Sequence, residues 1–127
     1  MAQLAILTPD PAPAEPLATA AAIDRNHLAR MTFGDRGLER ELLELFDKQA
    51  AILLVRMRAG GSAAIFALAH TLKGSAASIG AQGVARAALA AELAARATPG
   101  ECSLAVEALA EAVEEARALI AILLREH

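Results

Sequence analysis

Residues 98–126 read TPGECSLAVEALAEAVEEARALIAILLRE and form the clearest helical pattern in the chain. Apolar side chains recur there at alternating intervals of three and four residues, at Val106, Leu109, Val113, Ala116, Ile120 and Leu123. That spacing is typical of the seam between helices that pack nearly antiparallel. Thr98, Pro99 and Glu101 combine a capping side chain, a proline suited to a first helical turn and an acidic third position. They predict that a long amphipathic helix starts here and continues to the end of the chain.

Two more long helices are predicted by the same periodicity. Asp35 is placed to cap a helix that ends at Gly60-Gly61, with its apolar stripe at Leu38, Leu42, Phe46, Ala50, Leu53 and Met57. Ser62 is placed to cap the next helix, which Gly80 ends, with its stripe at Ile65, Leu68, Ala69, Leu72, Ala76 and Ile79.

A further helical segment covers about 81–97, and Asp24 can cap a short helix that stops at Thr32-Phe33-Gly34. The predicted fold is therefore all-α. We expect an up-and-down antiparallel four-helix bundle with an additional short N-terminal helix.

The composition favours the same fold and argues against several classes of partner. Of the 127 residues, 56% are hydrophobic but only 2% are aromatic, so Ala, Leu, Ile and Val must build the core. Runs of Ala and Leu have high helix propensity, whereas clusters of β-branched and aromatic residues are scarce. The formal net charge of −3 leaves no basic surface for nucleic acid or for an anionic membrane.

We expect one domain over 23–127, preceded by a flexible Pro/Ala-rich tail at 1–22. Four of the five prolines lie within 9–16, where they deny the backbone helical hydrogen bonds. No apolar run approaches the roughly 20 residues of a membrane-spanning helix. The lone Cys102 is compatible with a reducing compartment. These features predict a cytoplasmic monomer, and the initiating Met with a Pro-rich start favours a free-standing chain.

The segment 62–79 contains the residues that indicate chemistry. His70 lies about 200° around the helix from Leu72, so burial of Leu72 turns His70 toward solvent. Lys73 and Gly74 share the face of His70. A neutral imidazole is a competent nucleophile, and a neighbouring ammonium offsets phosphate charge. A mid-helix glycine costs about 1 kcal/mol relative to alanine, so Gly74 indicates that another molecule approaches the backbone closely.

The hairpin between the helices at 62–79 and 81–97 predicts a partner for His70. With the turn centred near Ala81, His70 and Glu92 lie equally far on either side and should meet at similar heights. We expect Glu92 to accept a hydrogen bond from Nδ1 and leave Nε2 free to attack. Arg96, one turn on, is placed to pair with Glu92 or to lend charge near a phosphate. Spacing alone is equally compatible with a plain surface histidine and a surface ion pair.

A family resemblance adds to this interpretation. Residues 70–77 read HTLKGSAA and are followed by IGA at 79–81, and together they closely resemble the signature of histidine-containing phosphotransfer (Hpt) domains. The segment FGDRGLERELLELF at 33–46 resembles the opening of that family's second helix. The resemblance covers about 23–125. One departure is Ala76, where the family often has a second serine.

The resemblance implies a phosphorelay carrier. His70 would take a phosphoryl group at Nε2 from the aspartyl phosphate of a receiver domain and pass it to the Asp of another receiver. Lys73 would neighbour the phosphate, Gly74 would give clearance, and Glu92 would contact the histidine. The chain would have no autokinase activity and no cofactor of its own, because the receiver holds the Mg²⁺.

Two other functions are compatible with a helical bundle. An adaptor that binds a receiver or a kinase without accepting phosphate would not use the His70 nucleophile, and intact His70, Lys73 and Gly74 disfavour it. A metal- or haem-binding bundle needs several inward ligands. The sequence supplies one central histidine and lacks the Glu-x-x-His pairs of di-iron bundles.

Overall fold

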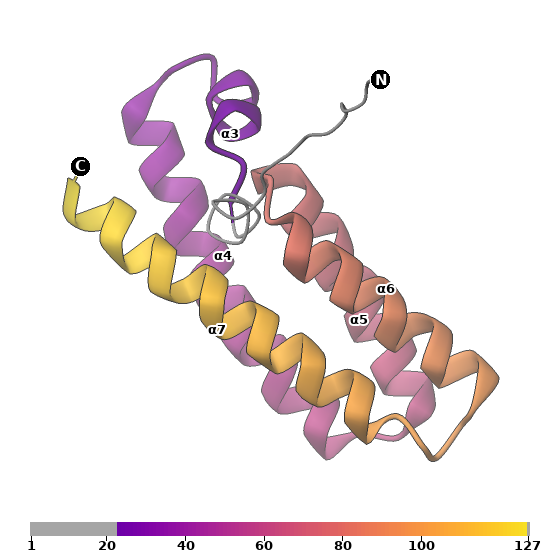
Figure 1. Ribbon diagram of the computed structural model, residues 1–127. Coiled ribbons are helices and arrows are strands. Elements are labelled where there is room, and N and C mark those ends of the chain that lie inside the picture. The colour runs from indigo at the N-terminus through magenta and orange to yellow at the C-terminus, as the bar shows by residue number, and fades with distance from the viewer. Residues whose placement is uncertain (1–22, 127) are drawn as a thin grey trace, which may run out of the picture.

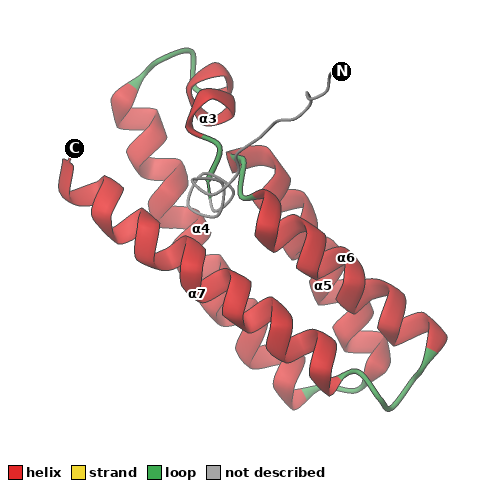
Figure 2. Cartoon of the chain, in the orientation of Figure 1, coloured by secondary structure: helices red, strands yellow, loops and turns green. Residues whose placement is uncertain are grey.

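The computed structural model describes residues 23–126, and every regular element in that range is a helix (Figure 2). The helices are α3 (Arg25–Met31), α4 (Arg36–Ala59), α5 (Ser62–Ile79), α6 (Gln82–Ala97) and α7 (Ser103–Glu126). The tail predicted at 1–22 lies outside the described residues.

The four long helices form a closed bundle in the order of the chain. Helix α4 packs against α5 and α7, and α6 packs against the same two helices, so the four surround one core. Successive helices run in opposite directions, as short turns require (Figure 1). The short α3 packs on α5, where the Asp24 N–H donates to the Gly80 carbonyl at 2.8 Å. The predicted all-α, up-and-down architecture with a short N-terminal helix is confirmed.

The predicted apolar stripes form most of the core. All six predicted positions of α7 are buried, as are Phe46, Ala50, Leu53 and Met57 of α4. Leu38 is an exception, because it lies in the first turn of α4 and is 38% exposed. Alanines fill much of the inner face of the most closely packed pair, α5 and α6, at Ala69, Ala76, Ala88, Ala91 and Ala95. Small side chains let two helix backbones approach closely, which brings residues of α5 within reach of α6.

Two of the four predicted N-caps are correct. Asp24 and Asp35 each accept a backbone hydrogen bond at 3.0 Å, from the N–H groups of His27 and Leu38. The predicted cap at Ser62 is wrong by one residue. Gly61 occupies the N-cap with no side-chain hydrogen bond, and Ser62 is the first helical residue.

The helix start predicted at 98–101 is also wrong. Thr98 instead ends α6, because its N–H and hydroxyl both donate to the Ala94 carbonyl. Gly100 has a φ of +90°, and the Glu101 N–H donates to the Thr98 carbonyl at 2.9 Å. A proline followed by a positive-φ glycine suits the two central positions of a type II turn. Pro99 and Gly100 therefore form a turn, and α7 begins later, at Ser103.

Gly80 ends α5 in the left-handed conformation, with φ +81°. A Cβ at this position would lie 2.8 Å from the Asp24 carbonyl oxygen. We expect Gly80→Ala to lower the free energy of unfolding by about 3 kcal/mol, through backbone strain and displacement of α3. Urea unfolding monitored by circular dichroism measures this change. Gly34→Ala is the matched control, since Gly34 has φ +75° but open space around it. Equal losses for the two variants would show that the contact with Asp24 has no energetic effect.

Candidate functional site

His70 lies near the middle of α5 on its outward face. Its side chain is 65% exposed, while its neighbours Ala69 and Leu72 are fully buried in the core. Burial of the apolar stripe therefore orients the imidazole toward solvent, as the helical spacing predicts. The ring is accessible to another protein.

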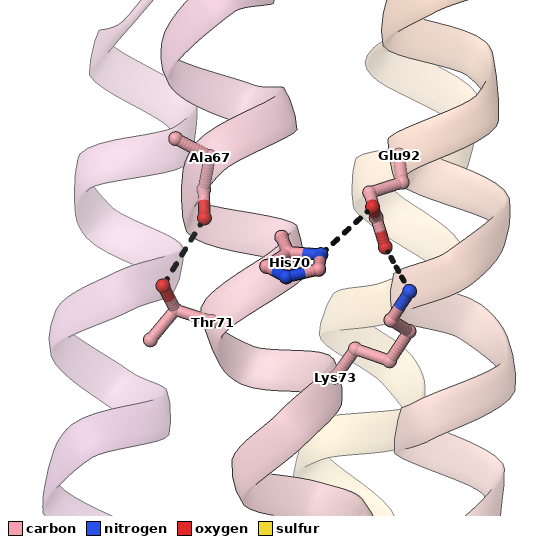
Figure 3. Close-up of polar contacts among 5 residues, drawn as sticks. All are labelled: Ala67, His70, Thr71, Lys73 and Glu92. Carbon is pink, nitrogen blue, oxygen red and sulfur yellow. Dashed lines mark hydrogen bonds and ion pairs between the residues drawn. The ribbon is translucent and has the colours of Figure 1, made fainter.

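Glu92 of α6 lies beside this ring and is buried. Its Oε2 is 3.0 Å from Nδ1 of His70, so the predicted contact between the two residues is confirmed. Its Oε1 is 2.7 Å from Nζ of Lys73. Figure 3 shows His70 and Lys73 extending from α5 toward the same carboxylate. The site is therefore a bridge in which one buried acid joins the imidazole and the ammonium.

The charge of Glu92 determines the state of the imidazole. The hydrogen bond from Lys73 lowers the pKa of Glu92, the contact with His70 lowers it further, and burial acts in the opposite direction. The net effect keeps the pKa below its ordinary value of 4.5, so the group is a carboxylate at neutral pH. An ionised carboxylate only accepts hydrogen bonds. Nδ1 of His70 must therefore be the donor, and in the neutral ring Nε2 keeps its lone pair.

Gly74 leaves open space next to His70 on the surface of α5. A Cβ at Gly74 would meet no atom within 4 Å. Ala77, one turn further on, is exposed and small. Lys73, which shares this side of the helix, is drawn onto Glu92. On the side of Gly74 and Ala77, the surface beside the imidazole is therefore free of bulky side chains.

Phe66 is a site residue that the sequence analysis missed. Its ring is stacked on that of His70, with centroids 6.5 Å apart and an interplanar angle of 15°. The guanidinium of Arg96 lies over the Phe66 ring, 5.7 Å from its centroid. Of the two roles expected for Arg96, the pairing with Glu92 is not made, and both carboxylate oxygens contact α5 instead. The signal for Phe66 is its position four residues before His70, one helical turn away.

The comparison with known families fits this geometry. The family model for the Hpt domain matches residues 38–119, which include all of α5 and α6. The chain belongs to the Hpt domain family. Hpt domains serve histidine phosphotransfer in phosphorelays, interact with receiver domains and are phosphocarriers rather than kinases. A search of curated proteins and a search of solved structures each found no match.

Two other kinds of site are not seen in the described part of this Hpt domain. Within 23–126, no three His, Cys, Asp or Glu residues are grouped so that they would hold a metal ion. None of the helices in that range is sufficiently long and apolar to cross a membrane.

Glu92 should make the stability of this Hpt domain depend on acid pH. A carboxyl group whose pKa is lower in the folded than in the unfolded state contributes stability above the unfolded value. That stability is lost as the pH falls through the folded value. We therefore expect the Glu92 contribution to decline below pH 4.5, the ordinary value. Glu92→Gln, which cannot titrate, should lose less unfolding free energy than the wild type as the solution is acidified.

Urea unfolding at a series of acid pH values measures this difference. Glu111→Gln is the control, because Glu111 is an exposed carboxylate on α7. The control variant should keep the wild-type pH dependence. Identical pH dependence in Glu92→Gln and the wild type would contradict the assigned direction of the pKa shift.

Proposed function

We propose that this Hpt domain accepts a phosphoryl group on Nε2 of His70 from a receiver aspartyl phosphate and passes it to the Asp of another receiver. The observation that supports this most directly is the 3.0 Å contact between Nδ1 of His70 and the buried Glu92 carboxylate. A histidine that only decorates a surface needs no such partner. The contact orients the exposed ring and supplies Nε2 as the nucleophile.

The transfer step needs no proton movement on this chain. The Nε2 lone pair attacks phosphorus, the bond from phosphorus to the aspartyl oxygen breaks, and the receiver carboxylate leaves. Nδ1 keeps its proton, so the ring acquires positive charge as the new N–P bond forms. Glu92, already in place and ionised, stabilises that charge without reorganisation. Attack on the phosphoryl group by a second receiver carboxylate reverses these bond changes and returns the ring to its neutral form.

Three further residues complete the proposed site. Lys73 neutralises Glu92 in the resting chain, and its ammonium lies one helical turn from His70, close enough to offset phosphoryl charge. Gly74 gives a receiver access to the ring. Arg96 adds positive charge on the side of Phe66. The receiver brings the Mg²⁺, and this chain contributes a positioned nucleophile with no cofactor and no autokinase activity. We also propose a cytoplasmic location, consistent with the free thiol of Cys102.

Transfer from a receiver tests the proposal. The purified full chain is mixed with a phosphorylated receiver and Mg²⁺, and then with a second, unphosphorylated receiver. We expect acid-labile, alkali-stable phosphate on the chain in the first step and its loss to the second receiver afterwards. The same chain with ATP alone should stay unlabelled. Stable binding of receivers without any labelling of the chain would instead favour the adaptor function.

A further inference from the structure

Helix α4 presents a line of large apolar side chains to solvent, opposite the stripe that it buries. Leu45, Ile52 and Val55 are 63%, 53% and 67% exposed, and their spacings of seven and three residues place them on one face. No other helix within 23–126 exposes as many large apolar side chains. Single exposed apolar residues are ordinary, but three on one helix face are a candidate interaction surface.

Charged side chains follow the same face of α4. Glu41, Lys48 and Arg56 are exposed, and the ion pairs found among residues 23–126 involve none of them. Together with the apolar line they form what we call the α4 stripe, defined as Glu41, Leu45, Lys48, Ile52, Val55 and Arg56. Its acidic residue lies toward the start of α4 and its basic residues lie toward the middle and the end.

Two pairs of residues in the α4 stripe lie symmetrically about one point of the helix. Leu45 and Ile52 lie equally far on either side of the midpoint between Lys48 and Gln49. Glu41 and Arg56 are also equally far from that midpoint. A second copy related by a twofold axis there would run antiparallel, with its Ile52 facing Leu45 and its Arg56 level with Glu41. The two Lys48 side chains would meet beside the axis, a single like-charge contact, whereas a parallel copy would bring like charges together at all three charged positions.

We propose that this chain forms an antiparallel homodimer through the α4 stripe. The contact would extend over about 22 Å of helix, at 1.5 Å per residue. One helix against one helix buries less than the roughly 1,200 Å² of a standard specific interface, so the dimer is weak and depends on concentration. His70 and Glu92 belong to α5 and α6, and both copies keep their sites open. This proposal replaces the monomer expected from sequence.

Sedimentation equilibrium of the full chain tests the dimer over about 1 μM to 1 mM, the range in which a weak interface is populated. The average mass should rise from 13.1 kDa toward twice that value. Leu45→Glu should raise the dimer dissociation constant by at least about tenfold, because it buries a charge in the contact. Leu89→Glu is the control, since Leu89 is 43% exposed on α6, which packs against α5 and α7 across the bundle from α4. It should leave association unchanged.

A charge exchange tests the antiparallel arrangement. Glu41→Arg and Arg56→Glu should each weaken association, and the double variant should restore it, because both pairs again have opposite charges. A wild-type mass of 13.1 kDa at every concentration overturns the proposal. Failure of the double variant to recover association also overturns it. If the chain is monomeric at every concentration and Leu45→Glu blocks phosphate uptake, the α4 stripe binds receivers and not a second copy.

Discussion

We expect replacement of His70 with glutamine to lower the rate of phosphate uptake from phosphorylated receivers by at least about 1,000-fold, because it removes the proposed nucleophile. Glutamine retains a side-chain amide that can donate a hydrogen bond, but it has no ring nitrogen to form the N–P bond. The fold should survive, since 65% of the His70 side chain lies in solvent. Rapid-quench transfer of radiolabelled phosphate measures the rate, and circular dichroism monitors folding.

His27→Gln is the matched control for this experiment. His27 lies on the short α3, and its backbone N–H bonds to Asp24. The control variant should accept phosphate at the wild-type rate. Normal labelling of His70→Gln, or loss of labelling in His27→Gln alone, would move the acceptor away from the site on α5.

Gly74→Leu should separate transfer from stability. The leucine side chain would project into the open space beside His70, so we expect transfer from receivers to fall by about 10- to 100-fold through poorer positioning. The same substitution removes a mid-helix glycine without a steric contact. The free energy of unfolding should therefore rise by up to about 1 kcal/mol.

Two controls define the cause of the Gly74→Leu effect. Gly74→Ala should give a similar gain in stability with at most a few-fold loss of transfer, because a methyl group occupies little of the open space. Ala108→Leu places the same side chain at an exposed position on α7 and should leave transfer unchanged. Wild-type transfer by Gly74→Leu would mean that receivers do not approach the backbone at Gly74.

Helix periodicity predicted the architecture because burial of one face is the dominant constraint on a bundle of this size. The buried residues of α7 match the predicted ones since nothing in that helix competes with the apolar seam. Local signals were less decisive at 98–101. Pro99 suits both a first helical turn and a β-turn, and the positive φ of Gly100 is what makes it a turn.

At the site, the register of the two helices was predictable, whereas the pairing of long side chains was not. The contact of Glu92 with His70 was predictable because a short turn and small packed side chains fix the register of α5 against α6. The partner of Lys73 was not, because a long flexible side chain reaches several positions. A buried carboxylate needs a compensating charge, and that need selects Glu92 for Lys73. Arg96 lies over Phe66, since His70 and Lys73 already contact the two carboxylate oxygens of Glu92.

In the proposed mechanism, Glu92 directs the phosphoryl group to one nitrogen of His70. Long-range ¹H–¹⁵N correlation spectra of the phosphorylated full chain report which ring nitrogen carries the phosphoryl group and which carries the proton. We predict phosphorus on Nε2 of His70 and a proton on Nδ1, hydrogen-bonded to Glu92. Phosphorus on Nδ1, or on any residue other than His70, would contradict the account.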